Sequence, residues 1–298
     1  MLYKTNILAM TGGGKNPKYN PNKVILWDEY QTKVLNEFKF TSNIKNIKLK
    51  KDKIFIVCEQ KIYVYSLDKD YKIIEIIETC DNIKGVIGIN SEALNTIIAY
   101  PVNPIGFVMI KNYEKSKSLT IKPYDNNISY ISINSNGTLI SISSNEGRLI
   151  RIFTILKGEF IEEFRRGKEK AEIDFICFDP FNNFMGVSSD RGTIHIWSLG
   201  NTWKIIKDKN IDIEKKEEIL PENHQSFLKI LPEFITGGIF NSDKSFAQIR
   251  LNDEKCIFSF GPENIIVVVS SNGKYYQSKF NDKKGGDCDI IYEESLYN

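Results

Sequence analysis

The chain has only two histidines, five scattered cysteines and no apolar run long enough to cross a membrane as a helix. No Cys-X-X-Cys pair occurs, so the sequence does not assemble the ligands of a zinc site, and we expect no metal and no cofactor. An odd number of scattered cysteines predicts reduced thiols and a cytoplasmic protein. A spanning helix needs about 18 consecutive apolar residues. Any contact with a membrane is therefore expected to be peripheral.

The chain also lacks a large charge of one sign. Its net charge is +2, from 40 Lys and Arg against 38 Asp and Glu. Without a broad positive field, binding to nucleic acid is not expected. Any site for an anion must be a local cluster of basic residues.

The sequence has no motif typical of an enzyme. Residues 12–15 (Gly-Gly-Gly-Lys) do not have the spacing of a phosphate-binding loop. Ser189, Asp190 and His195 lie close in the sequence, but the nucleophile elbow that would activate such a serine is missing. We therefore expect no catalytic residues.

Short strand signals fill the chain instead. Ile, Val, Tyr and Phe alternate or cluster in runs such as 53–58, 61–65 and 265–269, and Asn, Gly, Asp and Ser separate these runs. This pattern predicts an all-β fold. A β-sandwich and a β-propeller are both compatible with short strands alone.

An internal repeat favours the propeller. Residues 143–153 align with 188–197, so that Gly147 and Gly192 are 45 residues apart, and residues 270–276 form a third copy. A period of about 40–45 residues with four strands per unit is typical of WD-repeat propellers. We expect a single domain over 1–298 made of about six four-stranded units, at 1–40, 43–80, 85–124, 128–167, 171–251 and 255–298. The fifth unit carries a long loop insertion at about 200–235.

Two adjacent arginines end a predicted strand at Phe164-Arg165-Arg166-Gly167. Successive side chains of a strand point to opposite faces, so each arginine can serve a separate anion site. A guanidinium group matches the geometry of a phosphate with two parallel hydrogen bonds. The motif therefore predicts phosphate binding at one or both faces.

Motifs along nearly the whole chain resemble the PROPPIN family, the phosphoinositide-binding propellers that include the WIPI proteins. The resemblance is carried by residues 6–14, 21–28, 78–85, 98–101, 147–153, 164–167, 189–195 and 245–248. It implies a seven-bladed propeller that binds phosphatidylinositol 3-phosphate and 3,5-bisphosphate. It also implies a monomeric adaptor that recruits autophagy factors, among them a lipid-transfer protein docked on the blade loops, to preautophagosomal, endosomal or vacuolar membranes. The family has about one further blade before the segment with which this chain begins. Either the N-terminal blade is missing by truncation, which we favour, or the ring closes with six blades.

The resemblance also assigns two headgroup pockets, one on each side of the arginine strand. The first would use Arg165 with Ser144, Arg148 and Arg151, and the second would use Arg166 with Ser189, Thr193 and His195. Two positions in the first pocket depart from the family pattern. Arg148 replaces a threonine, where it either donates to a phosphate or blocks the pocket, and Tyr124 replaces a histidine. We therefore expect unequal sites, with the second closer to the family pattern.

The insertion falls where the family has a membrane-inserting loop. Its apolar residues Phe227, Leu228, Ile230 and Leu231 would contact the membrane, although such a cluster could equally be core. The alternative function is a protein-interaction propeller whose lipid sites have degenerated. Tyr124, Arg148 and the missing blade motivate that alternative.

Overall fold

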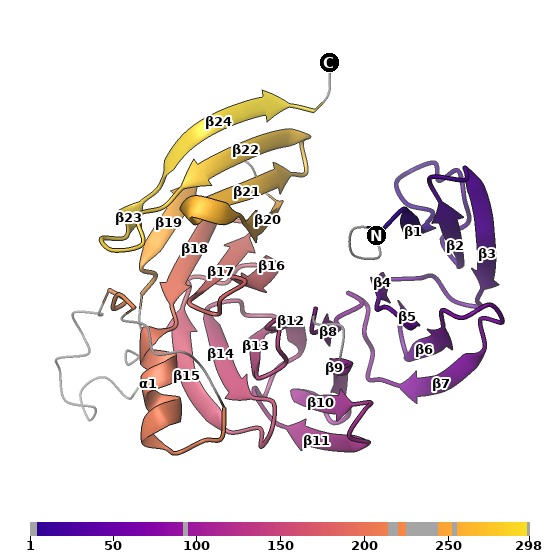
Figure 1. Cartoon of the computed structure of the whole chain (residues 1–298), viewed down its shortest axis with the longest axis horizontal. Coiled ribbons are helices and arrows are strands. Elements are labelled where there is room, and N and C mark those ends of the chain that lie inside the picture. The colour runs from indigo at the N-terminus through magenta and orange to yellow at the C-terminus, as the bar shows by residue number, and fades with distance from the viewer. Residues whose placement is uncertain (1–4, 92–94, 214–219, 225–243, 252–254, 297–298) are drawn as a thin grey trace. The chain divides into compact units, whose positions relative to one another are not determined.

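The computed structural model describes residues 5–91, 95–213, 220–224, 244–251 and 255–296, which form six β-sheets (Figure 1). The chain divides into two units, residues 1–122 and 123–298. Nearly all strands pair antiparallel with their neighbours in sequence, as expected for chains folded from consecutive hairpins. The all-β prediction is confirmed.

The first unit contains three sheets. Their strands are β1 (Ile7–Thr11), β2 (Lys23–Asp28) and β3 (Lys33–Lys39) in one; β4 (Asn46–Leu49), β5 (Lys53–Val57), β6 (Lys61–Ser66) and β7 (Ile73–Glu78) in the next; and β8 (Gly88–Ile89), β9 (Ile97–Val102), β10 (Phe107–Asn112) and β11 (Lys117–Ile121) in the third.

The first of these sheets corrects the prediction of four strands within 1–40. Among the described residues it has three, because residues 12–22 connect β1 to β2 without forming a strand. This stretch contains three glycines and two prolines, which disfavour a paired strand.

The second unit contains the other three sheets and the predicted arginine strand. Their strands are β12 (Ile128–Ile133), β13 (Leu139–Ser144), β14 (Leu149–Thr154) and β15 (Phe160–Arg165); then β16 (Ile173–Phe178), β17 (Phe184–Ser189), β18 (Thr193–Ser198) and β19 (Ala247–Arg250), with β23 (Gly286–Asp287) added in parallel; and finally β20 (Cys256–Phe260), β21 (Ile265–Ser270), β22 (Lys274–Lys279) and β24 (Asp289–Ser295).

A core cluster joins the β12–β15 sheet to the β16–β19 sheet. Ile150 and Ile152 of β14 and Phe164 of β15 pack against Val187 and Trp197 of the next sheet. The rings of Phe164 and Trp197 lie 5.6 Å apart, and both side chains are fully buried. Burying each such side chain stabilises the fold by about 1.5–3 kcal/mol. This contact fixes which residues of the two sheets face each other.

The insertion after β18 begins with a helix, which the sequence analysis did not predict. Helix α1 (Gly200–Asp208) runs beside β15 (Figure 1). Thr202 Oγ1 lies 2.6 Å from a carboxylate oxygen of Glu162, and Trp203 Nε1 donates to Asn182 O at 2.7 Å. Ile206 is buried in the core cluster. The start of the insertion therefore covers the sheet.

The predicted membrane-contact residues 227, 228, 230 and 231 lie outside the described residues. Within the described part of the chain, α1 and the other helical segment are too short to span a bilayer.

Asp174 of β16 predicts a pH-dependent stability. One carboxylate oxygen is buried without a hydrogen-bond partner among the described residues, and burial raises the pKa of Asp174 from 3.8 to about 6. Glu172 and Asp190 raise this pKa further, whereas Lys255 opposes them. A folded-state pKa above the unfolded value means that stability is lost as pH rises from about 4 through 6. The free energy of unfolding of Asp174→Asn, minus that of the wild type, should therefore increase by about 1 kcal/mol from pH 4 to pH 7.5, after discounting for solvent access. Thermal unfolding of both proteins at the two pH values measures this difference. An equal difference at both would contradict the pKa shift.

Candidate anion-binding site

The two adjacent arginines lie on opposite faces of the β12–β15 sheet, as the sequence predicts. Phe164 packs into the core cluster that faces the β16–β19 sheet, and Arg166, two residues on, has the same orientation. Arg165 is in register with Leu149 of β14, and the side chains of both residues point to the other face of the sheet. Each arginine therefore belongs to a different set of neighbours.

Arg166 is a buried and tightly held guanidinium group. Its side chain is about as buried as the hydrophobic core, with the residue 8% exposed. Nε donates to Gly147 O at 2.7 Å, and Nη2 donates to Glu169 O. Gly147 has a φ of +59°, and a Cβ there would lie 2.0 Å from Ala171 O, so the turn that supplies this carbonyl requires glycine. The repeat glycine thus positions the arginine.

The residues predicted to share a site with Arg166 lie on the facing side of the β16–β19 sheet. Ser189 of β17 is in register with Thr193 of β18. Strand alternation puts Ser189, Thr193 and His195 on the face that carries Val187 and Trp197, which packs toward Phe164. The His195 ring lies 5.7 Å from the Trp197 ring, and its Nδ1 is 3.0 Å from Ser245 Oγ. The structure therefore brings the second predicted set together between two neighbouring sheets.

Positive charges act on one another around Arg166 and His195, although Arg191 and Arg250 are themselves paired with Glu169 and Asp287. Burial, followed by the charges of Arg166 and Arg250, lowers the pKa of His195 to about 4. Burial also lowers the pKa of Arg166, and the neighbouring Arg191 charge lowers it further, against smaller opposing effects of Asp190 and Glu169. An anion placed here would relieve repulsion that the folded chain otherwise bears. His195 is neutral at pH 7 in the free protein.

Ser189 adds an unused hydrogen-bonding group. Its side chain is fully buried, and within the described residues its Oγ has no hydrogen-bond partner. A buried hydroxyl without a partner costs about 1–3 kcal/mol. The hydroxyl is therefore available to bond an ordered water or a ligand.

The cations assigned to the first pocket are also paired within the chain. Arg151 Nε lies 2.7 Å from a Glu163 carboxylate oxygen, and its guanidinium stacks over the Tyr124 ring at 4.5 Å. Arg148 is exposed and lies 3.3 Å from Glu146. Carboxylates therefore neutralise two of the three predicted cations of the first pocket.

The side chains of Tyr124 and Ser144, both assigned to or near the first pocket, also have hydrogen-bond partners within the chain. The Tyr124 hydroxyl lies 2.9 Å from Leu149 O and 3.1 Å from Ile142 O, and burial raises the pKa of this tyrosine. Ser144 Oγ accepts a hydrogen bond from Glu146 N at 3.3 Å. The predicted first set is thus adjacent in the sheet, but its polar groups already have partners.

The sequence analysis missed two cations near the second set, Arg191 and Arg250. Arg250 of β19 is in register with Thr193, and its Nε lies 3.3 Å from Asp287. Arg191 Nη2 donates to Lys170 O at 2.9 Å. Arg191 lies within residues 189–195, which carry part of the family resemblance, and could have been found. Arg250 could not, because the sequence does not give the register of β19 against β18 across the long insertion.

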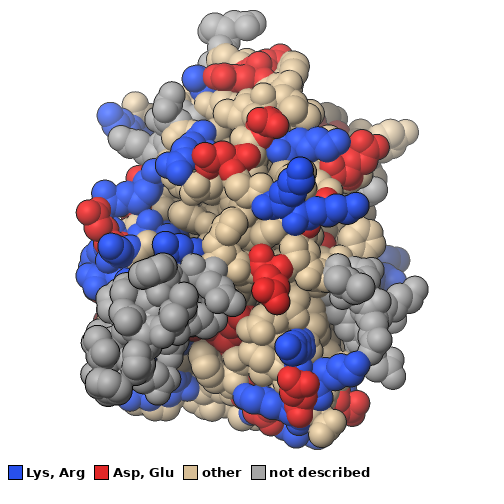
Figure 2. Space-filling model, turned by 90° about the vertical axis from the view of Figure 1, so that its left-hand side faces the viewer, with Lys and Arg blue, Asp and Glu red and all other residues tan. Residues whose placement is uncertain are grey.

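The charge of the site is local. On the face in Figure 2, Lys and Arg side chains are interspersed with Asp and Glu, and no single sign covers the visible described surface. Among the described residues no cluster of metal-ligating side chains occurs. The arrangement can bind an anion with several oxygen acceptors through guanidinium and hydroxyl donors.

These features define a β-propeller type of protein in which basic and hydroxyl side chains gather between two neighbouring sheets. A family model described as PROPPIN matches residues 18–297, and the chain belongs to this family. It is 32% identical over 292 residues to autophagy-related protein 18e of Arabidopsis thaliana, covering 96% of this chain and 72% of the relative. It is 26% identical to autophagy-related protein 18 of Schizosaccharomyces pombe over 98% of this chain and 85% of the relative.

Solved structures agree on the fold. Hsv2 of Kluyveromyces lactis superposes with a TM-score of 0.74 at 19% identity, covering 99% of this chain and 85% of Hsv2. KlAtg21, solved with the coiled coil of AgAtg16, gives a TM-score of 0.74 at 17% identity, covering 99% of this chain and 84% of KlAtg21. The chain is thus an autophagy-type PROPPIN with a propeller fold, and not an enzyme.

The orphan hydroxyl gives a test that separates stability from binding. Ser189→Ala should leave the free energy of unfolding unchanged or slightly higher, because it removes a buried group without a partner. The same change should weaken the binding of soluble inositol 1,3-bisphosphate about 3–10-fold, the equivalent of one hydrogen bond. Chemical denaturation and isothermal titration calorimetry measure the two effects.

Ser143→Ala is the matched control. Ser143 is equally buried, but its Oγ lies 3.2 Å from Ser144 O, so its loss should cost about 0.5–1.5 kcal/mol of stability and leave binding unchanged. A loss of stability without a loss of affinity in Ser189→Ala would mean that the hydroxyl is structural.

Proposed function

We propose that the chain is a phosphoinositide-binding adaptor that reads phosphatidylinositol 3-phosphate and 3,5-bisphosphate and recruits autophagy or membrane-trafficking factors. The observation that carries this proposal is the buried Arg166 guanidinium, with the unpartnered Ser189 hydroxyl on the facing side of the next sheet. The particular lipids come from the family resemblance. What the pocket itself supports is binding of a phosphate group.

A phosphate monoester suits this donor set better than a carboxylate. It carries a charge of about −1.5 to −2 near neutral pH and three acceptor oxygens. One oxygen can accept from Arg166, and the others can accept from the hydroxyls of Ser189 and Thr193. The bound phosphate also offsets the like charges of Arg166 and Arg250 around His195. The inositol 3-phosphate is therefore expected at this pocket.

The face of Arg165 would act as a secondary site. Its cations Arg148 and Arg151 must leave Glu146 and Glu163 before they can bind a phosphate, and breaking these pairs reduces the gain. This pairing is also the observation that favours the alternative function, a protein-interaction scaffold with degenerate lipid sites. Measured lipid affinity decides between the two.

Recruitment requires a membrane signal and a partner. KlAtg21 was solved with a coiled coil of AgAtg16, and by analogy we propose that this chain docks an autophagy factor, such as a lipid-transfer protein, on its blade loops. Residues 227, 228, 230 and 231 would add apolar contact with preautophagosomal, endosomal or vacuolar membranes. A headgroup site and an apolar contact are each weak alone, so stable attachment needs both.

Substitution of the two arginines should have unequal effects on lipid binding. Arg166→Gln should weaken binding to vesicles that contain phosphatidylinositol 3-phosphate about 10–100-fold, because it removes a charge-assisted bond worth about 1.5–3 kcal/mol. Arg165→Ala should weaken it less than about threefold, because that face is largely neutralised. Vesicle co-sedimentation with phosphatidylinositol and its 3-phosphate measures both.

Lys157→Gln serves as the control for the loss of one exposed cation that is paired with a glutamate, and it should change little. Native circular dichroism is required of each variant, since Arg166 also holds two backbone carbonyls. Equal losses in Arg165→Ala and Arg166→Gln would contradict a dominant second site. Absence of any preference for the 3-phosphate in the wild type would favour the protein scaffold.

His195 predicts how lipid binding depends on pH. Its pKa in the free protein is about 4, and an adjacent phosphate favours the imidazolium form and raises that pKa. Binding then takes up a proton, so affinity should rise as pH falls from 7.5 to 6, relative to a variant that cannot titrate. The ratio of wild-type to His195→Gln affinity for inositol 1,3-bisphosphate at the two values measures this, because protonation of the phosphate itself cancels. A ratio independent of pH would place His195 outside contact with the phosphate.

A further inference from the structure

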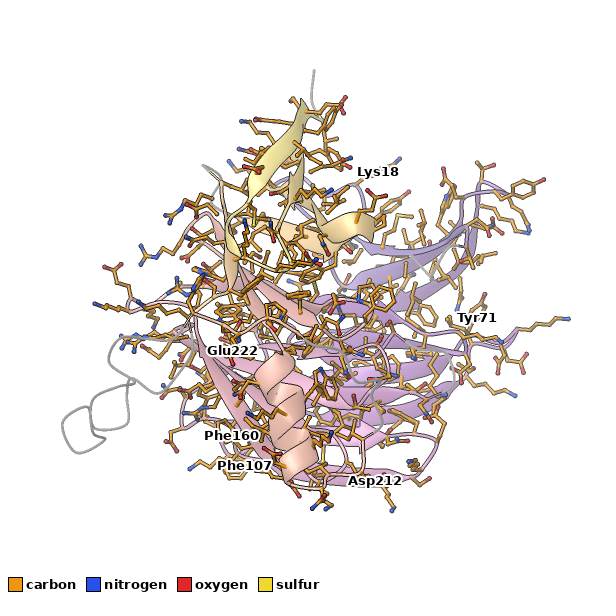
Figure 3. All side chains as sticks on the ribbon, turned by 60° about the vertical axis from the view of Figure 1, so that its left-hand side comes forward. Lys18, Tyr71, Phe107, Phe160, Asp212 and Glu222 are labelled. Carbon is orange, nitrogen blue, oxygen red and sulfur yellow. The ribbon has the colours of Figure 1, made fainter. Side chains whose placement is uncertain are left out.

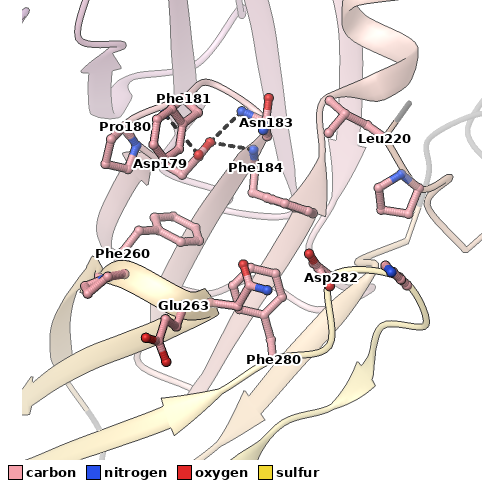
Figure 4. A pocket seen from close by; sticks show the side chains of 15 residues that line it. Asp179, Pro180, Phe181, Asn183, Phe184, Leu220, Phe260, Glu263, Phe280 and Asp282 are labelled. Atoms are coloured by element: carbon pink, nitrogen blue, oxygen red, sulfur yellow. Dashed lines mark hydrogen bonds between the residues drawn. The ribbon is translucent and has the colours of Figure 1, made fainter. Parts of the chain in front are cut away.

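A pocket of about 940 Å³ lies away from the arginine strand, where the β16–β17 turn meets the β20–β21 turn and the segment after β22 (Figure 4). Leu220 and Pro221 complete its wall. Sites for specific ligands in proteins have volumes of about 300–1,000 Å³. None of the residues that line this cavity belongs to the anion site, and core side chains do not fill it.

The floor of the pocket is aromatic. Phe184 and Phe280 are buried, with ring centroids 5.1 Å apart, and Phe260 lies 6.3 Å from Phe280. Edge-on packing of these rings gives a rigid apolar surface. A large apolar side chain would be well accommodated on it.

An exposed phenylalanine forms the lip of the pocket. Phe181 is 74% exposed, although the residue lies in a turn with little freedom. The Asp179 carboxylate accepts hydrogen bonds from the backbone N–H groups of Phe181 at 3.0 Å, Asn183 at 2.5 Å and Phe184 at 2.6 Å. The turn is therefore preorganised to hold an aromatic ring in solvent, an arrangement that favours contact with a partner.

The rim of the pocket is acidic. Glu263 and Asp282 line it together with a single cation, Lys283. Within the described part of the chain neither carboxylate takes part in an ion pair. Glu263 also has a left-handed φ of 54°, which a residue with a side chain adopts at a cost, and such turns are frequent at binding sites. The pocket therefore favours a cationic ligand and disfavours an anionic headgroup.

We propose that this pocket binds a short extended peptide segment of a partner protein, in which a large apolar residue is flanked by Arg or Lys. The apolar side chain lies on the Phe184, Phe260 and Phe280 floor beside Phe181. Since successive side chains of an extended peptide point to opposite sides, the flanking residues reach the rim, where Glu263 and Asp282 bind the cation. Cation–aromatic contact with the exposed Phe181 ring adds to this attraction.

The peptide pocket and the anion site can be occupied together. Strand β17 begins at Phe184 in the wall of the pocket and ends at Ser189, one of the residues assigned to the anion site. A strand of this length spans roughly 17–20 Å. The two sites therefore lie at opposite ends of one sheet.

Panning a surface-displayed library of random heptapeptides on the full chain tests the proposal. Enriched sequences should pair an aromatic or large aliphatic residue with at least one Arg or Lys. The consensus peptide, labelled and titrated by fluorescence anisotropy, should bind at least tenfold more weakly to Phe181→Ser and to Glu263→Lys. Both residues are exposed, so the variants are expected to fold.

Phe160→Ser and Asp212→Lys are the matched controls, since both residues are exposed and lie near the end of α1 remote from Glu222 (Figure 3). These two variants should bind the peptide like the wild type. All four variants should bind vesicles with phosphatidylinositol 3-phosphate as the wild type does. Three results would overturn the proposal. They are a failure to enrich any common sequence on the wild type beyond what Glu263→Lys also enriches, a consensus without a basic residue, or peptide binding by the pocket variants that equals that of the wild type. Loss of vesicle binding in the pocket variants alone would mean that the pocket contacts a lipid surface instead.

Discussion

The hydrogen bonds that hold the Arg166 guanidinium against the carbonyl groups of Gly147 and Glu169 are the interaction on which the site depends. They fix a buried positive charge between two sheets, with Arg191 and Arg250 close enough to affect the site. Burial and like-charge repulsion both oppose this arrangement, as the lowered pKa values of Arg166 and His195 indicate. An anion at this position would offset that repulsion, which is the physical basis of the proposed phosphate site.

The packing of Phe164 against Trp197 sets the geometry of this charge. It fixes the register of the two sheets, so that alternation along β15, β17 and β18 directs Arg166, Ser189 and Thr193 into one interface. The same alternation sends Arg165 to the opposite face, where Glu163 already pairs with Arg151. Two sites related by one strand thus differ in chemistry. One presents a buried guanidinium and the unpartnered Ser189 hydroxyl, with ion pairs among the described residues only at its outer cations Arg191 and Arg250, whereas the other must break the Arg151–Glu163 pair to bind.

Much of this could be predicted from the sequence, because local patterns determine it. Alternation in 149–153 and the repeated glycines at 147 and 192 predicted strands, turns and the opposite directions of the two arginines. Helix α1 could not be predicted, because Leu199 at its start offers no capping side chain. Arg250 joins the site only through pairing of β19 with β18 across the long insertion. The hydrogen bond of Tyr124 with Leu149 and the ion pair of Arg151 with Glu163 use donors on the Arg165 face. These contacts could not be predicted from the spacing of residues in the sequence.

A crystal structure of the chain with inositol 1,3-bisphosphate at saturating concentration would test the central claim most directly. The account predicts one phosphate within hydrogen-bond distance of the Arg166 guanidinium and of Ser189 Oγ, with His195 beside it. It also predicts that the ion pairs of Arg148 with Glu146 and of Arg151 with Glu163 are retained. An empty Arg166 pocket, with the phosphate bound instead by Arg165 and Arg151, would contradict it.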